Sequence, residues 1–380
     1  MGKKKLRLQT QDSNVILDNG LLKVTISNPQ GYVSGIKYGG MDNLLDVKSS
    51  ESKRGYWDIN WSWPGGKDRY QLLKGSEFNV INTSDDIIEL SFKKVFNQSS
   101  QGNKLPLGVD IRYVMRTGIP GFYCYAIYEH PSECRAFDLA QTRMVFKLRK
   151  EKFHYMAISD EKQRIMPMPE DLHRGRGEQL IVPESVLLVN PINPDLKGEM
   201  FHGTHYIGED ILTQIKEGET WRKVFGPFLV YLNSTPDVSE AHNLWIDAKE
   251  QRMLEEEAWP YDFVSSSFYF IANERGSISG RLLVQDRYVS SSSIPARDAH
   301  IGLSAAREEG AWQTESKEYQ FWVQTDSNGD FTIRNIIPGV YGLHGWVPGF
   351  IGDYLHKSLV TVSAGPLLFS TEVFLLPMSN

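Results

Sequence analysis

The sequence predicts a mostly β protein, a large antiparallel β-sandwich followed by a smaller one. Over the first 230 residues short apolar runs alternate with turn residues, and in NVILDNGLLKVTISNPQGYVSGIKYGG the dipeptide Asn19-Gly20 joins two such runs. Helical spacing of apolar residues is almost absent there. Many strands without interleaved helices favour an antiparallel sandwich, and a chain of 380 residues is long enough for two domains.

One helix interrupts the β pattern, from Asp237 to about Glu257. Five apolar residues recur there at helical spacing between charged ones: Val238, Ala241, Leu244, Trp245 and Ala248. A second all-β module follows, with turns at 326–330 and at Pro338-Gly339. Its regular strands predict a small sandwich of the fibronectin type III or transthyretin-like kind. We therefore expect one domain over residues 1–265 and a module over 272–378.

Composition restricts the class of protein. The chain is 41% hydrophobic, 12% aromatic and 23% charged, which is typical of a globular protein. No apolar run reaches the length of a membrane span, so we expect no membrane association. The formal net charge of −6 excludes a broad basic surface for nucleic acid. Cys124 and Cys134 are too few for a disulfide framework or a thiolate metal cluster, and the start MGKKKLRLQTQDSN lacks the apolar segment of a signal peptide.

The segment EMFHGTHYIGED, residues 199–210, carries two histidines three positions apart. On a helix His202 and His205 would converge on a metal, but the glycines of the segment disfavour a helix, and on a strand they face opposite ways. A single histidine acting as an acid or base stays open beside a structural role. The turn at 326–330 is not a calcium loop, because Gly329 is at its fourth position and Ile337 at its twelfth. We predict no metal site.

The segment RGYWDINWSWPGG places tryptophans at alternate positions. In an extended strand Trp57, Trp61 and Trp63 share one face, whereas Asp58 and Asn60 lie on the other. Flat aromatic faces stack on the CH faces of pyranose rings, so the segment could form a sugar-binding platform. Alternatively the tryptophans belong to the core, where Trp is highly buried on average. A mixture of the two roles is also open.

Two clusters of cations suggest an anionic ligand. In TRMVFKLRK, the side chains of Arg143, Lys147 and Arg149 fall on one face of a predicted strand. The loop DLHRGRGEQL carries Arg174 and Arg176 beside glycines, and an Arg guanidinium binds a carboxylate through two hydrogen bonds. A solvent-exposed strand and an ordinary surface loop would have the same composition, so both alternatives stay open.

A series of segments in order resembles the plant-type rhamnogalacturonan endolyases of polysaccharide lyase family four. The segments of the first domain are RGYWDINW, RYVMRTGIPGFYCYAIYEH, FDLAQTRMVFKLR, MPMPEDLHRGRG, ESVLLVNPINPDLKGE, THYIGED and RKVFGPFLVYLNS. The resemblance continues in the second module through GSISGRL and QTDSNGDFTIRNIIPGVYGLHGW. It therefore covers almost the whole chain.

The resemblance implies a galactose-mutarotase-like sandwich, a fibronectin type III-like module and then a carbohydrate-binding jelly roll. It implies β-elimination at the bond between rhamnose and galacturonate in the acidic polysaccharide rhamnogalacturonan I of pectin. No cofactor is implied. We expect a monomer, and an extracellular location at the cell wall, although the sequence shows no export signal.

The implied reaction defines the groups that it needs. The proton at C5 of galacturonate is barely acidic, so cations must stabilise the charge that develops on the adjacent carboxylate, and a base must remove the proton. The resemblance assigns the acid/base histidine to His205 and a basic pair along the substrate groove to Arg143 and Lys147. Trp61 and Arg176 complete the predicted substrate-binding set from the residue patterns above.

The chain departs from the family's pattern beside His205. Several dozen residues expected between Glu199 and His205, with the family's catalytic lysine, are absent, and Lys197 matches a different lysine. A jelly roll is expected after Asn380. We therefore expect impaired catalysis and a first domain less stable than in a complete relative. The alternatives are a non-catalytic carbohydrate-binding relative and, by analogy of fold, an aldose epimerase-like enzyme.

Overall fold

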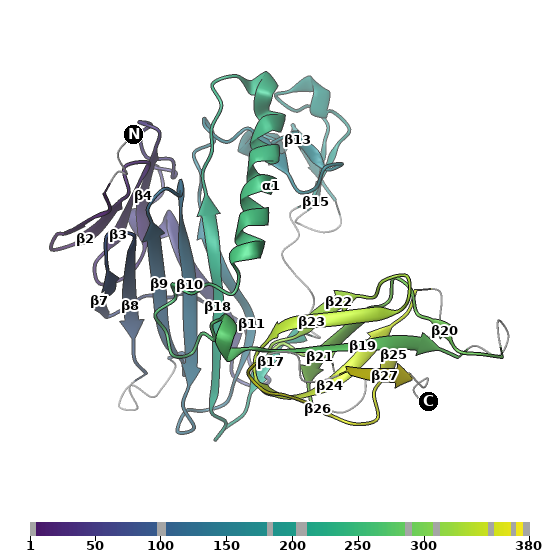
Figure 1. Cartoon of the computed structure of the whole chain (residues 1–380). Coiled ribbons are helices and arrows are strands. Elements are labelled where there is room, and N and C mark those ends of the chain that lie inside the picture. Colours follow the sequence, from purple (N-terminus) through teal and green to yellow (C-terminus); the bar gives the residue numbers. More distant parts are fainter. Residues whose placement is uncertain are drawn as a thin grey trace. The chain divides into compact units, whose positions relative to one another are not determined.

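The computed structural model describes residues 5–96, 104–180, 185–202, 211–285, 291–306, 312–348, 353–365 and 370–374. The chain divides into two compact units: Met1–Glu209 with Ile215–Leu254, and Asp210–Gln214 with Glu255–Asn380. Both are built mainly of antiparallel strands (Figure 1), which confirms the predicted fold class. The domain boundaries expected from the sequence, 1–265 and 272–378, stay a prediction.

The first unit contains a large sheet with strand order β1-β2-β3-β4-β5-β11-β17, in which β6 also pairs with β5. Its strands are β1 (Arg7–Thr10), β2 (Asn14–Asp18), β3 (Leu22–Ser27), β4 (Val33–Tyr38), β5 (Gly55–Ser62), β6 (Arg69–Leu72), β11 (Phe137–Phe146) and β17 (Thr213–Ile215). The predicted hairpin is present between β2 and β3, where Gly20 has φ +79° and the Asn19 side chain accepts a hydrogen bond from the Leu22 amide at 2.9 Å.

A second sheet of the first unit has strand order β18-β10-β9-β8-β7. Its strands are β7 (Glu77–Thr83), β8 (Ile87–Lys94), β9 (Gly108–Arg116), β10 (Gly121–His130) and β18 (Trp221–Tyr231). One hydrophobic core takes alternate side chains from both sheets, for example Trp57 of β5 and Tyr113 of β9. Trp57 Nε1 donates to Cys124 Sγ at 3.0 Å within this core. Cys124 and Cys134 are both buried free thiols.

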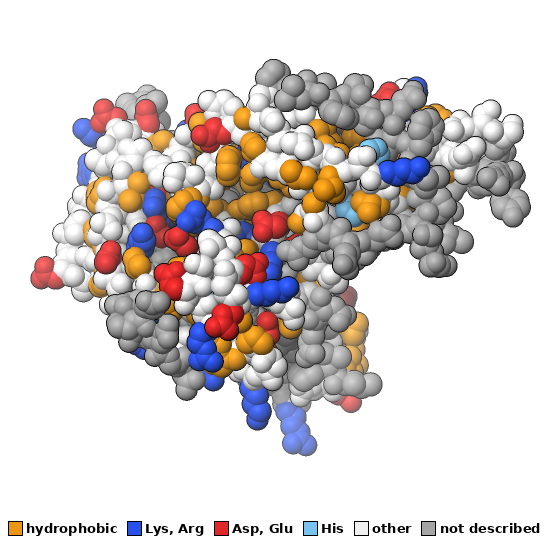
Figure 2. All heavy atoms as spheres, turned by 90° about the horizontal axis from the view of Figure 1, so that it is seen from below, with side chains coloured by type: hydrophobic (Ala, Val, Ile, Leu, Met, Phe, Trp, Pro, Cys, Tyr) orange, Lys and Arg blue, Asp and Glu red, His pale blue; other side chains and the backbone are white. Residues whose placement is uncertain are grey.

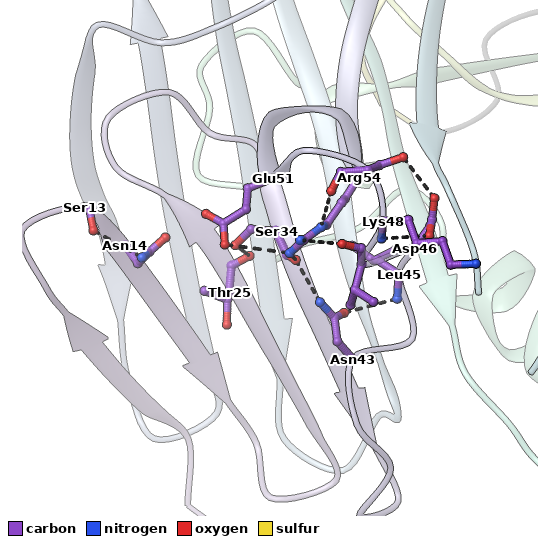
Figure 3. Close-up of polar contacts among 12 residues, drawn as sticks. Ser13, Asn14, Thr25, Ser34, Asn43, Leu45, Asp46, Lys48, Glu51 and Arg54 are labelled. Atoms are coloured by element: carbon purple, nitrogen blue, oxygen red, sulfur yellow. Dashed lines mark hydrogen bonds and ion pairs between the residues drawn. The ribbon is translucent and has the colours of Figure 1, made fainter.

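The connection from β4 to β5 is fixed by two polar side chains (Figure 3). Asn43 donates to the Ser34 carbonyl at 3.0 Å and accepts from the amides of Ile36 and Leu45 at 3.0 and 3.1 Å. Arg54 donates to three backbone carbonyls, those of Ser34, Val47 and Ser49. The loop before β5 is thus anchored without a regular strand.

Smaller elements complete the first unit. A hairpin joins β12 (Tyr155–Ala157) and β13 (Gln163–Ile165), and a three-stranded sheet contains β14 (Gly177–Gln179), β15 (Ser185–Leu188) and β16 (Met200–His202). The predicted helix is present as α1 (Ala241–Ala258), preceded by a 3-10 turn at Val238–Glu240. Further 3-10 helices among the described residues are η1 (Glu51–Lys53), η3 (Pro169–Leu172) and η4 (Pro194–Leu196) in the first unit and η7 (Ala272–Glu274) in the second.

The second unit is a small sandwich with its own core. One sheet has the order β20-β19-β23 with β27 parallel to β19, and the other has the order β22-β21-β24-β25 with β26 beside β24. Its strands are β19 (Gly276–Val284), β20 (Ile294–Pro295), β21 (His300–Ala305), β22 (Phe321–Gln324), β23 (Asp330–Ile336), β24 (Gly339–Trp346), β25 (Asp353–Leu355), β26 (Val360–Val362) and β27 (Ser370–Phe374). Before β23, the Asp326 side chain accepts from the Asn328 and Asp330 amides at 2.8 and 2.9 Å, as in an ordinary Asx turn.

A buried ionic network crosses β8, β9 and β10. Arg112 donates to Glu89 at 2.9 Å and to Asp110 at 2.8 Å, and Asp110 also accepts from the Ser91 hydroxyl at 2.6 Å. The Tyr125 hydroxyl donates to Glu89. The two carboxylates raise the pKa of Arg112 against the opposing effect of its burial. Because charges taken out of water need partners, each member of this network depends on the others.

Replacing Arg112 by Met should destabilise the protein by about 3–5 kcal/mol, because it leaves two buried carboxylates without their cation. Denaturant unfolding of the full chain would measure the loss. The matched control is Arg222→Met, which breaks a half-exposed ion pair with Glu129 at 2.6 Å and should cost about 0–1 kcal/mol. Equal effects of the two substitutions would contradict the prediction.

Candidate functional site

An ion pair between β5 and β11 forms the centre of the candidate site. Asp58 and Arg143 are directly opposite in the register of the two strands. Arg143 Nε donates to Asp58 Oδ1 at 2.8 Å and Nη2 donates to Oδ2 at 3.1 Å, so the contact is bidentate. The side chain of Asp58 is 1% exposed and that of Arg143 is 32% exposed. A buried carboxylate therefore holds a guanidinium that is still reached by solvent.

The remaining donors of Arg143 are available to a ligand. Among the described residues, no hydrogen bond involves Arg143 Nη1. The hydrogen bonds to Asp58 raise the pKa of Arg143 above its usual value, so the cation is permanent. A positioned guanidinium with one free edge is suited to a carboxylate, which accepts two parallel hydrogen bonds.

Tyr70 of β6 lies beside this ion pair and was missed by the sequence analysis. It is 57% exposed, and its ring centroid is 5.9 Å from Arg143 Cζ. Burial of the hydroxyl, a hydrogen bond with Tyr56 and the charge of Asp58 raise the pKa of Tyr70 well above its usual value. Its phenol is therefore neutral and is not a base. The exposed ring offers an apolar surface next to a cation.

Neighbouring polar residues extend the site along the strands. Asn60 is opposite Tyr70 on one side and Gln141 on the other, and its Nδ2 donates to Gln141 Oε1 at 3.4 Å. We call the set Asp58, Asn60, Tyr70, Gln141 and Arg143 the β5–β11 polar face. It combines a cation, amide groups and one exposed ring, which are the groups that an acidic sugar chain needs.

Asp138 continues the same face at the far end of β5, opposite Ser62. It is 7% exposed, and burial raises the pKa of its carboxyl. Within the described ranges it has no hydrogen-bond or ion-pair partner. Burial therefore disfavours the charged form of this carboxyl. A β-bulge between Leu139 and Gln141 separates it from Arg143.

The tryptophans of β5 lie on the opposite face. Trp57 and Trp61 are 2% and 1% exposed and belong to the core, which is one of the two roles that the sequence left open. Trp63 is partly buried and contacts Trp61 edge-on, with ring centroids 5.0 Å apart. A contact between Trp61 and a sugar ring stays a prediction that its burial does not support.

Lys147 lies just beyond the strand that carries Arg143, because β11 ends at Phe146. Its backbone amide donates to the Arg54 carbonyl at 2.7 Å, and its carbonyl accepts from the Asp46 amide at 2.8 Å. The side chain is exposed. Strand alternation therefore does not determine its direction, and the predicted pairing of Lys147 with Arg143 along one face stays a prediction.

The two remaining predicted residues are not brought to the polar face by any described contact. Arg176 is exposed in the turn after η3, where its amide donates to the His173 carbonyl at 3.1 Å and its carbonyl accepts from Val189 and Asn190 at 2.9 Å each. His205 lies outside the described residues. Their roles therefore rest on the sequence alone.

On the face shown in Figure 2, Lys and Arg side chains are interspersed with Asp and Glu, without a continuous basic patch. None of the described helices has the length and apolarity needed to span a bilayer. Within the described ranges, no group of three or more His, Cys, Asp or Glu side chains is arranged to hold a metal ion.

Comparison with known proteins gives concordant family matches. The family model "Rhamnogalacturonate lyase family" matches residues 1–200, and the model "Polysaccharide lyase family 4, domain II" matches residues 291–367. Rhamnogalacturonate lyase of Dickeya dadantii is 25% identical, over 90% of this chain and 62% of its own length. Rhamnogalacturonate lyase B of Emericella nidulans is 20% identical, over 92% of this chain and 60% of its own length.

The chain thus spans about 60% of the length of these curated relatives. Among solved structures, the Bacillus anthracis TIE protein aligns with 99% of this chain and 41% of its own, at 6% identity and a TM-score of 0.19, which is too low to carry an argument. The first family model covers more than half of the chain. The chain therefore belongs to the rhamnogalacturonate lyase family.

Proposed function

We propose that this chain binds an acidic rhamnogalacturonan on the β5–β11 polar face and cleaves its rhamnose–galacturonate bond by β-elimination. The observation that supports this best is the bidentate Asp58–Arg143 pair, which presents a fixed cation with a free Nη1. Lys147 and Arg176 would add positive charge along the polymer. Two relatives that are named rhamnogalacturonate lyases support the same proposal.

The chemistry of the reaction explains why a fixed cation is needed. A base removes the C5 proton of galacturonate, a C4–C5 double bond forms, and the C4–O bond to rhamnose breaks with protonation of the leaving oxygen. Negative charge builds on the galacturonate carboxylate during proton removal. A guanidinium that is already oriented stabilises that charge without reorganising. In this proposal Arg143 binds the carboxylate and the exposed ring of Tyr70 supplies an apolar face.

The proton transfer is assigned to His205, the residue that matches the family's histidine. The family's lysine segment is absent between Glu199 and His205, so the proposal includes a reduced rate. That absence also favours one second candidate: a non-catalytic protein that binds the same polysaccharide through the polar face. In both cases the expected location is extracellular, at the cell wall.

His205→Ala should abolish or strongly reduce lyase activity. The assay incubates the full chain with rhamnogalacturonan I and follows the ultraviolet absorbance of the unsaturated uronate. Loss of an acid/base group typically lowers the rate by about 10²–10⁴-fold. The control is His356→Ala, which replaces a partly buried histidine of the second unit. Full activity of His205→Ala would contradict the assignment, whereas binding without product in the parent protein would favour the second candidate.

Arg143→Lys should weaken binding of rhamnogalacturonan I by about 10–100-fold, because lysine keeps the charge but loses the fork, and hydrogen bonds to charged groups contribute about 1.5–3 kcal/mol. Titration calorimetry at fixed ionic strength would measure the affinity. Arg222→Lys, in the half-exposed pair with Glu129, is the matched control and should bind like the parent. Affinity of Arg143→Lys within a factor of about two of the parent would rule out the bidentate role.

A further inference from the structure

A separate pocket lies within the first unit, between α1, the β12–β13 hairpin and the ends of β4 and β18. Its volume is about 810 Å³, within the range of small-molecule sites. Of the residues in the β5–β11 polar face, none lines it. The lining includes four aromatic residues: Tyr38, Phe153, Tyr155 and Trp245. The pocket is therefore distinct from the site proposed above.

Polar contacts on both sides of α1 fix the position of this helix, which forms one wall of the pocket. On the hairpin side, Asp160 accepts from Trp245 Nε1 at 2.7 Å and from Lys249 Nζ at 2.6 Å, and His242 is bonded to Gln163 at 3.1 Å. These bonds fix the helix to the hairpin, next to which it is drawn in Figure 1.

On the other side, α1 is bonded to β18 and the segment after it. The Tyr231 hydroxyl donates to Asp247 at 2.8 Å, and Asn233 Nδ2 donates to Asp247 and to the Leu244 carbonyl, each at 2.8 Å. The helix is thus clamped in place by hydrogen bonds rather than by packing alone. Because hydrogen bonds fix the helix on both sides, the pocket beside it is a fixed feature of the folded structure.

The side chains that face this space are too small to fill it. Ala241, Leu244, Trp245 and Ala248 recur at helical spacing, and all four line the pocket. An apolar helix stripe normally packs against a core, but here two of its members are alanines, and Ala157 lines the hairpin side. The space is concave and open to solvent on one side, and a preformed concavity of this size with apolar and polar walls has the usual form of a small-molecule site.

The polar groups of the pocket indicate the chemistry of the ligand. Asn233, Ser234 and Thr235 line one side. Asn233 Nδ2 and Thr235 Oγ1 already bond within the chain, so the groups offered to the hydroxyls of a ligand are Asn233 Oδ1 and the Ser234 hydroxyl. The charged lining is balanced, with one acidic residue, Glu151, and one basic residue, Lys152, beside a histidine. Aromatic walls with hydroxyl-bonding groups and no net charge fit a sugar ring that carries no carboxylate.

We propose that this pocket binds a neutral pyranoside of one or two sugar residues. The aromatic rings would cover the CH faces of the ring, and the Asn233–Thr235 segment would bond its hydroxyls. The site differs in charge from the polar face, which is built around a cation, and so it would select different ligands. The inference does not depend on the proposed lyase activity.

Saturation-transfer NMR and calorimetry on the full chain would test this site. The probes are methyl β-galactoside, methyl β-glucoside, lactose and cellobiose, with digalacturonate as the acidic comparison. At least one neutral probe should bind saturably, and Ala248→Leu and Ala157→Leu, which fill the pocket from opposite walls, should each weaken that binding by about tenfold or more. Thermal unfolding would establish that each variant is folded. Because the two variants are independent, the test still holds if one of them fails to fold.

Two matched variants separate this proposal from the proposed function. Arg143→Lys should weaken the binding of rhamnogalacturonan I and leave the binding of the neutral probe unchanged. Ala248→Leu should weaken the binding of the neutral probe and leave the binding of rhamnogalacturonan I unchanged. Binding of digalacturonate in the pocket, unchanged affinity in both filled variants, or no saturation transfer with any neutral probe at millimolar concentration would each overturn the proposal. So would binding of an apolar aryl probe, such as anisole, without binding of any sugar.

Discussion

The bidentate contact between Asp58 and Arg143 is the interaction on which the candidate site depends. It joins β5 to β11, the two strands that carry most of the polar face, and it places a charge that solvent can reach on a carboxylate that solvent cannot. A surface arginine without such a partner would lose side-chain entropy each time it binds a ligand, and this loss would weaken the affinity. Here that ordering is already present in the folded protein, and β6 adds Tyr70 to the same cation.

Much of the fold can be predicted from the local alternation of apolar and polar residues, whereas the site depends on the register in which distant strands pair. The alternation in RGYWDINW correctly separates the tryptophans from Asp58 and Asn60, but it does not say which face meets the second sheet. Burial of Trp57 and Trp61 decides this. The contact of Asp58 with Arg143 joins residues 85 positions apart, and no local periodicity encodes that pairing. Tyr70 was missed for the same reason, because its neighbours come from the register of β6 on β5.

The end of β11 and the surroundings of the helix were also not predictable from the sequence. Arg143 and Lys147 share a face only while the strand continues, and β11 ends at Phe146. The helix was predicted correctly from its apolar spacing, but that spacing does not determine what the apolar side of the helix faces. Its hydrogen bonds to Asp160 on one side and from Asn233 on the other are contacts between distant segments, and they turn a core-like stripe into the wall of a pocket.

The burial of Cys124 has a consequence for how the folded protein responds to oxidants. Its thiol lies fully buried, it accepts a hydrogen bond from the Trp57 indole, and burial raises its pKa to about 12. Burial also raises the pKa of Cys134 to about 11. Such thiols form little thiolate and react slowly with oxidants or disulfides. Once the protein has folded, both thiols are therefore shielded in a reducing and in an oxidising compartment alike.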